Sequence, residues 1–143
     1  MKPDQLKKEA ETPEHRCLAR KLVAWLKEHD YPNIICASDG EHDECKADDF
    51  NGRIPDVFAR KISASYAAIG EAKRCEDIGD SKVTDQLRDL ADVAEKNAWK
   101  LFLMVPCGCE LRWRDWIKEE GLGDWRVVCT ENCKGGNIVR DHR

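Results

Sequence analysis

This 143-residue chain lacks any long run of apolar residues. No apolar stretch approaches the roughly 20 residues that a membrane-spanning helix needs, so no membrane partner is expected. The first residues, Met1 to Gln5, have no apolar region of the kind found in secretory signals, so a cytoplasmic location is expected. The chain also lacks internal repeats and a glycine-rich loop that would cradle a phosphate. Its length and mixed composition are typical of one globular domain.

The chain also lacks an excess of positive charge, because its 24 Lys and Arg residues are outnumbered by 28 Asp and Glu residues, for a net charge of −4. A net negative chain argues mildly against nucleic-acid binding. The negative charge is concentrated in residues 38–52, where six acids and one lysine give −5 and leave +1 for the rest of the chain. A solvated acidic loop explains this run, and the mildly basic remainder is compatible with nucleic acid.

Hydrophobic periodicity and cap residues predict an α/β chain with the element order α-β-β-β-α-β-α-β. Thr12 and Pro13 are typical of a helix N-cap and first helical position, and residues 1–11 are expected to be a flexible segment before a domain at 12–143. The run 100–106 is continuously apolar, as in a buried strand. The predicted helices are 13–29, 81–97 and 110–120, and the predicted strands are 33–37, 57–62, 66–69, 100–106 and 125–129.

Two acids and a lysine follow a spacing that predicts a metal site. Asp56 precedes one predicted strand, Glu71 follows the next, and Lys73 lies two residues further on. Side chains alternate along a strand, so Glu71 and Lys73 point to the same face, and a hairpin would bring Asp56 to the same corner. Two carboxylates beside an ammonium suit a hard cation and phosphoryl chemistry. Surface acids at strand ends, with the lysine paired to Glu71, are the alternative.

The segments Pro55-Asp56 and Glu71-Ala72-Lys73, in this element order, resemble the PD-(D/E)XK nuclease superfamily and its restriction-endonuclease-like fold. The resemblance covers about residues 12–106. It implies a single-domain αβββαβ core with a mixed central sheet, to which a C-terminal helix and strand are added. The Gly-x-x-Pro-Asp form and a helical glutamine are similar to those of small virus-type and junction-resolvase-like nucleases.

The resemblance implies a role for each residue of the motif. Asp56, Glu71 and the backbone carbonyl of Ala72 would bind Mg²⁺ or Mn²⁺. Lys73 would stabilise the charge that develops on the phosphate, or orient the attacking water.

Two helical residues are further candidates. Glu14 lies four residues before Leu18 of the apolar stripe, and members of the superfamily similarly carry an acid on this helix that reaches the metal through water. An acid that only favours the helix dipole is an equal alternative. Gln86 flanks the inward face of the second helix, where the superfamily's glutamine positions water or DNA; a boundary glutamine of an amphipathic helix is its alternative. His15 is close enough to approach the same site, but we interpret it as a solvated surface residue.

Eight cysteines in a chain without a secretory signal are more typical of thiols or metal ligands than of disulfides. Cys17 and Cys36 are interpreted as small buried hydrophobic residues. Four other cysteines follow or end the strands at 100–106 and 125–129. A helix joins these strands, so they should run parallel and bring the four thiols together at their C-terminal ends, where a structural zinc ion would bind. Unrelated thiols, or one chance disulfide, are the alternative. The predicted zinc ligands are Cys107, Cys109, Cys129 and Cys133.

The sequence therefore predicts a metal-dependent endonuclease that hydrolyses DNA phosphodiester bonds. A non-catalytic nucleic-acid- or protein-binding module on the same fold is the alternative, and RNA is a weaker substrate option. A chain of this size offers little DNA-binding surface, so a homodimer or a partner subunit is expected to supply specificity.

Overall fold

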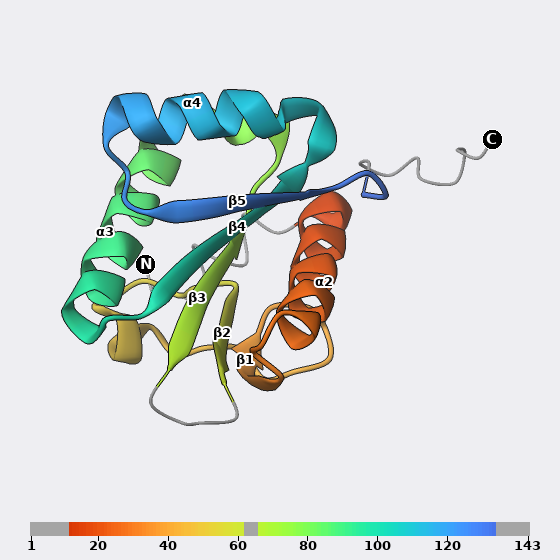
Figure 1. Ribbon diagram of the computed structural model, residues 1–143, viewed down its shortest axis with the longest axis vertical. Coiled ribbons are helices and arrows are strands. Elements are labelled where there is room, and N and C mark those ends of the chain that lie inside the picture. The colour runs from red at the N-terminus through yellow and green to blue at the C-terminus, as the bar shows by residue number, and fades with distance from the viewer. Residues whose placement is uncertain (1–11, 62–65, 134–143) are drawn as a thin grey trace.

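The computed structural model describes residues 12–61 and 66–133 (Figure 1). Residues 1–11, predicted to be a flexible segment, lie outside the described residues, as do 62–65 and 134–143. The described elements follow the predicted order. The helices are α2 (Pro13–Glu28), α3 (Ser81–Asn97) and α4 (Glu110–Glu120), and the strands are β1 (Asn33–Ala37), β2 (Val57–Arg60), β3 (Ala67–Ala72), β4 (Lys100–Pro106) and β5 (Trp125–Thr130).

The strands form one mixed sheet in the order β1-β2-β3-β4-β5, which confirms the α/β class. The β1–β2 and β2–β3 pairs are antiparallel, whereas β3–β4 and β4–β5 are parallel, as predicted for the last pair. The parallel pairs arise because α3 and α4 each connect one strand to its neighbour. The ends of β1, β3, β4 and β5 and the start of β2 consequently lie at one edge, which we call the carboxyl edge.

Helices cover both faces of the sheet, with α2 on one side and α3 and α4 on the other (Figure 1). In β4, Leu101, Leu103 and Val105 pack toward α3 and α4, while Phe102 and Met104 pack toward α2. This burial on both faces explains the continuous apolar run of that strand. Within the described ranges, no helix combines the length and apolar composition needed to cross a membrane.

Two features define where α2 begins and how closely it packs on the sheet. Thr12 caps the helix, and its Oγ1 accepts a hydrogen bond from the His15 backbone N–H at 3.0 Å. Gly70 of β3 allows close approach, because a Cβ atom there would lie 2.7 Å from Leu22 Cδ2. The first turn of α2 lies at the carboxyl edge, where His15 contacts Asp56.

All eight cysteines form disulfides, so the prediction of thiols or metal ligands is wrong for this structure. Every disulfide includes a cysteine in, or within three residues of, the end of β1, β3, β4 or β5. The four cross-links therefore gather at the carboxyl edge. Because disulfides are rare in cytosolic proteins, they give no support to the expected cytoplasmic location. The pairs are Cys17–Cys133, Cys36–Cys45, Cys75–Cys109 and Cys107–Cys129.

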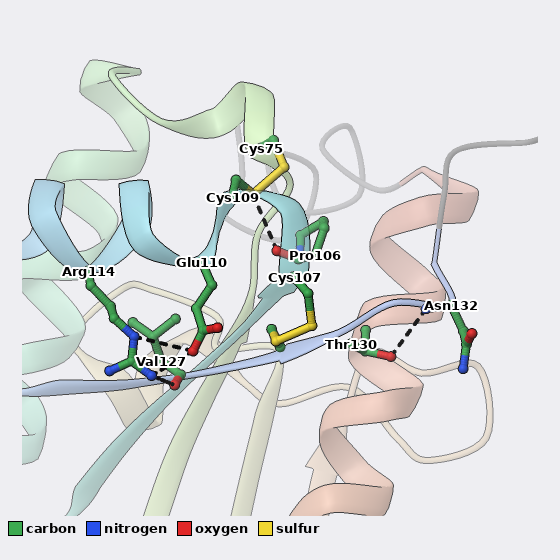
Figure 2. Close-up of a disulfide and its surroundings, with 10 residues drawn as sticks. Cys75, Pro106, Cys107, Cys109, Glu110, Arg114, Val127, Thr130 and Asn132 are labelled. Atoms are coloured by element: carbon green, nitrogen blue, oxygen red, sulfur yellow. Dashed lines mark hydrogen bonds and ion pairs between the residues drawn. A yellow bond between two sulfur atoms is a disulfide. The ribbon is translucent and has the colours of Figure 1, made fainter.

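The predicted zinc cluster is also wrong in this state, although its four cysteines do lie in or near the ends of β4 and β5; Figure 2 shows two of them, Cys107 and Cys109. Cys107 pairs with Cys129 across the parallel strands, with 4.8 Å between their Cα atoms. The 3₁₀ turn Cys107–Cys109 redirects Cys109 toward Cys75, which follows β3. Cys133 instead reaches α2, where it bonds Cys17. The four predicted zinc ligands therefore belong to three different disulfides and do not share one metal centre.

Candidate active site at the carboxyl edge

The β2–β3 hairpin brings the two acids of the motif together. Val57 pairs with Gly70, so the next residues outward along the hairpin, Asp56 and Glu71, lie side by side. The Asp56 backbone N–H donates to Glu71 Oε2 at 2.7 Å, and the Ala72 N–H donates to Asp56 Oδ2 at 2.8 Å. Both acidic residues are fully buried. The expected convergence at a corner of the sheet is therefore present, with each acid tied to the other strand.

Lys73 completes this corner on the face covered by α3. Its Nζ lies 3.5 Å from Glu71 Oε1 and donates to Gln86 Oε1 at 2.5 Å. Its backbone N–H donates to Met104 O at 3.1 Å, which fixes the residue at the end of β3. Glu71 and Lys73 thus share a face as expected, and Gln86 of α3 orients the ammonium group. The alternative interpretation, in which Lys73 forms an ion pair with Glu71, is compatible with this arrangement.

His15 is buried, so its interpretation as a solvated surface residue is wrong. Only 5% of it is exposed, and its Nε2 lies 3.0 Å from Asp56 Oδ2. The sequence carried a signal for this, because His15 lies three residues before Leu18 and seven before Leu22. Those spacings place all three on one face of the helix. The polar character of histidine outweighed this spacing in the sequence-based interpretation.

Glu14 lies at the same helical turn but has a different environment. It is half-buried, and its pKa is raised by burial and by the charges of Glu76 and Asp77, while Arg74 opposes the shift. These three neighbours belong to the segment that follows Lys73. Its contact with a metal through water stays a prediction.

The acidic segment 38–52 contributes Ser38 to the site. The Ser38 backbone N–H donates to Asp56 O at 2.8 Å, and its hydroxyl donates to Asp56 Oδ1 at 3.1 Å. Nothing in the sequence pattern pointed to this serine. The following Asp39 is buried too; burial alone would raise its pKa, but hydrogen bonds from the Glu41 and His42 backbone and the His42 ring lower it. The start of the acidic segment is therefore ordered structure beside the site, closed by the Cys36–Cys45 disulfide.

The donor set at this corner fits a hard divalent cation. Mg²⁺ takes oxygen ligands and keeps several waters, so one or two protein carboxylates suffice. In the described part of the chain, no group of three or more His, Cys, Asp and Glu side chains is arranged to hold a metal ion. The protein's share would therefore be Asp56, Glu71 and the Ala72 carbonyl. Two adjacent buried carboxylates are stabilised by positive charge nearby; Lys73 supplies one such charge, and a divalent cation would add to it.

A separate hollow of about 1070 Å³ lies at the opposite edge, where β4 and β5 begin. Trp25, Trp99 and Arg126 are among its lining residues. Its lining contains four acids and four bases, so it has no concentrated charge of either sign. The buried charged groups lie at the carboxyl edge, and for that reason we place the candidate active site there.

Comparisons with models of protein families, with curated proteins and with solved structures find no match. The residues of the site therefore carry the functional assignment by themselves.

Proposed function

We propose that this chain is a metal-dependent endonuclease that hydrolyses DNA phosphodiester bonds, with a PD-(D/E)XK site on a restriction-endonuclease-like core. The observation that supports it most is the buried convergence of Asp56, Glu71 and Lys73 at the end of the β2–β3 hairpin. Buried charges are costly to fold and contribute little stability, so their presence favours a chemical role. The order of α2 to β4 around a mixed sheet agrees with the αβββαβ core of that superfamily.

Each residue of the corner has a distinct task in this proposal. A divalent cation held by Asp56, Glu71 and the Ala72 carbonyl would polarise the scissile phosphate and lower the pKa of a bound water. Lys73 would stabilise the negative charge that grows on the phosphate oxygens in the transition state. Gln86 accepts a hydrogen bond from Lys73 and so fixes where the ammonium group points.

The test is a plasmid-cleavage assay in Mg²⁺, in Mn²⁺ and in EDTA. We expect cleavage with either metal and none in EDTA. Asp56→Asn, Glu71→Gln and Lys73→Met should each lower the rate by about 100-fold or more, the usual cost of removing a group that stabilises transition-state charge. Lys73→Met should keep more DNA affinity than cleavage activity, because its role is in the transition state.

Matched controls are available on α3. Asp85→Asn and Lys82→Met remove the same charges from exposed positions and should leave cleavage unchanged. Undiminished cleavage by both Asp56→Asn and Glu71→Gln would refute the proposal. DNA binding without cleavage in any metal would favour the non-catalytic binding module, and cleavage of RNA alone would reassign the substrate. Sedimentation of the same samples would test whether the protein is a homodimer. If it is a monomer, a partner subunit is the remaining proposed source of specificity.

A further inference from the structure

His15 is the α2 side chain that reaches the candidate site, yet the proposed reaction gives it no task. Its Nε2 lies 3.0 Å from Asp56 Oδ2, and the Ala72 N–H lies 2.8 Å from the same oxygen. A carboxylate oxygen has two lone pairs, so two N–H donors fill Oδ2. Asp56 can then offer a cation only its other oxygen, Oδ1, which already accepts one hydrogen bond from the Ser38 hydroxyl at 3.1 Å, unless His15 moves away.

The surroundings of the His15 imidazole indicate which of its two nitrogens carries the proton. His15 Nδ1 is buried, and no described residue forms a hydrogen bond with it. The tautomer with its proton on Nε2 donates to Asp56 and leaves only an acceptor unpaired at Nδ1. The opposite tautomer would bury an unpaired donor and place two acceptors face to face. The N–H of His15 therefore points at Asp56.

Packing alone does not account for a histidine here. A leucine would fill a similar volume on this apolar helix face without burying an unpaired nitrogen, which costs stability. The imidazole is therefore placed for its hydrogen bond, and the partner of that bond is an acid of the candidate site.

We propose that His15 is a positioning residue, which holds Asp56 Oδ2 so that Oδ1 faces the divalent cation. This inference rests on the proposed function, because it assigns a task within the same site. Groups that hydrogen-bond a metal ligand commonly change metal affinity by about 10–100-fold when they are removed. His15 would belong to this class, together with the Ala72 N–H on the same oxygen.

The experiment measures Mn²⁺ binding by calorimetry for the wild type, His15→Leu, His15→Gln and Val23→Ala. The leucine variant should bind Mn²⁺ about 10–100-fold more weakly, because it keeps the volume and removes the donor. The glutamine variant should restore binding to within a few fold, because its amide can donate to Asp56. Val23→Ala is the control for general destabilisation of α2, since Val23 is buried elsewhere on the helix, and it should bind as the wild type does. Equal Mn²⁺ affinity in His15→Leu and the wild type would overturn the proposal, as would equal losses in His15→Leu and Val23→Ala.

Amide hydrogen exchange on the same proteins without metal separates this inference from the proposed function. If Asp56 loses its anchor in His15→Leu, the Ala72 N–H should exchange faster, while the Lys73 N–H, which is bonded to Met104 O, should be unaffected. Absence of Mn²⁺ binding in the wild type would count against the metal-dependent nuclease. In that case faster exchange at Ala72, seen in His15→Leu and absent in Val23→Ala, would still show that His15 positions Asp56. Unchanged exchange would overturn that role.

Discussion

Glu14 shows how burial and the segment that follows Lys73 act on a single titrating group. Burial and the nearby charges of Glu76 and Asp77 raise its pKa above the ordinary value of 4.5. The folded protein therefore binds this proton more tightly than the unfolded chain does. Its ionised form opposes folding at neutral pH, and this cost is relieved as the pH falls through the raised pKa.

We expect Glu14→Gln to stabilise the protein at pH 7 relative to the wild type. The difference should vanish below about pH 4, where the glutamate is protonated in both folded and unfolded chains. Urea unfolding of both proteins at the two pH values measures it. An acid that acted mainly through the helix dipole would behave oppositely, so that the substitution would cost about 0.3–1 kcal/mol at pH 7. If Glu14 does reach the metal through water, the same variant would also need more metal for cleavage.

The residues of the motif could be predicted because their spacing along two consecutive strands is local information. Asp56, Glu71 and Lys73 converge as soon as the hairpin forms. The contact between His15 and Asp56 spans 41 residues and depends on how α2 lies on the sheet. Ser38 reaches Asp56 because β1 pairs with β2 so that Ala37 lies opposite Val57, and the sequence gives no sign of that pairing.

At the scale of elements, the contact between α2 and β3 sets the position of the helix that carries His15. A methyl group on Gly70 would lie 2.7 Å from Leu22 Cδ2 and 3.3 Å from Leu22 Cγ. Leu22 is fully buried in the core between α2 and the sheet, so its side chain has little room to move. The absence of a side chain at Gly70 is therefore a packing requirement of this interface.

Gly70→Ala should lower the free energy of unfolding by about 1–3 kcal/mol, the usual cost of overpacking a core. The loss should be smaller in a Leu22→Ala background, because the clashing atoms are gone. Denaturant unfolding of the four proteins in this cycle measures the coupling. Gly108→Ala is the control: a methyl group there meets no atom within 4 Å, and stability should change by less than about 0.5 kcal/mol. Additive effects in the cycle would contradict the close contact.

The acidic segment gives a prediction at the same scale. Its acids Asp43, Glu44, Asp48 and Asp49 are exposed, and Gly40 near the start of this segment approaches the side chains of Arg16 and Arg20 of α2. We expect the combined change Asp43→Asn, Glu44→Gln, Asp48→Asn and Asp49→Asn to tighten nonspecific DNA binding at low salt, because repulsion of phosphates is removed.

The control for this variant carries the same change in net charge on a different element. It neutralises four exposed acids on or next to α4, and its effect on DNA affinity should be smaller. Fluorescence anisotropy across a salt titration compares the two, and equal effects would mean that the acidic segment lies away from the DNA path. The control positions are Asp115, Glu119, Glu120 and Asp124.

Element boundaries could be predicted where the signals were local. The caps of α2 and the start of α3 agree with the sequence, because capping depends on neighbouring residues. The strand predicted at 66–69 instead continues to Ala72, since Gly70, Glu71 and Ala72 pair with β4. This pairing is a tertiary contact, and it places Glu71 opposite Leu103 within the sheet instead of beyond the end of a strand.

For the whole molecule, the disulfides differ in how much chain they enclose. Cys17–Cys133 joins residues 116 apart, whereas Cys36–Cys45 joins residues 9 apart. In the chain-entropy description, a longer enclosed loop restricts the unfolded state more. The first link should therefore contribute more to global stability, and the second mainly to local order beside Ser38.

We expect Cys17→Ala/Cys133→Ala to lose about 2 kcal/mol more stability than Cys36→Ala/Cys45→Ala. Guanidinium unfolding under oxidising conditions measures both double variants against the wild type. Equal losses would show that the loops are already restricted in the unfolded chain or that their native packing differs.

The cysteine pairing could not be predicted, for two physical reasons. The composition of the N-terminal residues bears on the cellular compartment and not on the geometry of the cysteines. The parallel arrangement of β4 and β5 was predicted correctly, but the turn at Cys107–Cys109 sends its two cysteines to different partners. The conformation of this three-residue turn decides which cysteines pair, and hydrophobic periodicity carries no information about such a turn.

That turn also poses a problem of chemical isomerism. Eight cysteines can pair in about one hundred ways, and the nearest wrong isomer exchanges only the partners of Cys107 and Cys109. These two are separated by Gly108 alone, so chain connectivity barely distinguishes the isomers. The forming sheet must select between them through thiol–disulfide exchange, since a mispaired bond that sets early can be corrected only by an attacking thiolate. Homogeneous material therefore requires an oxidant together with an isomerase or a thiol buffer during production, and peptide mapping across this turn is the direct check of product identity.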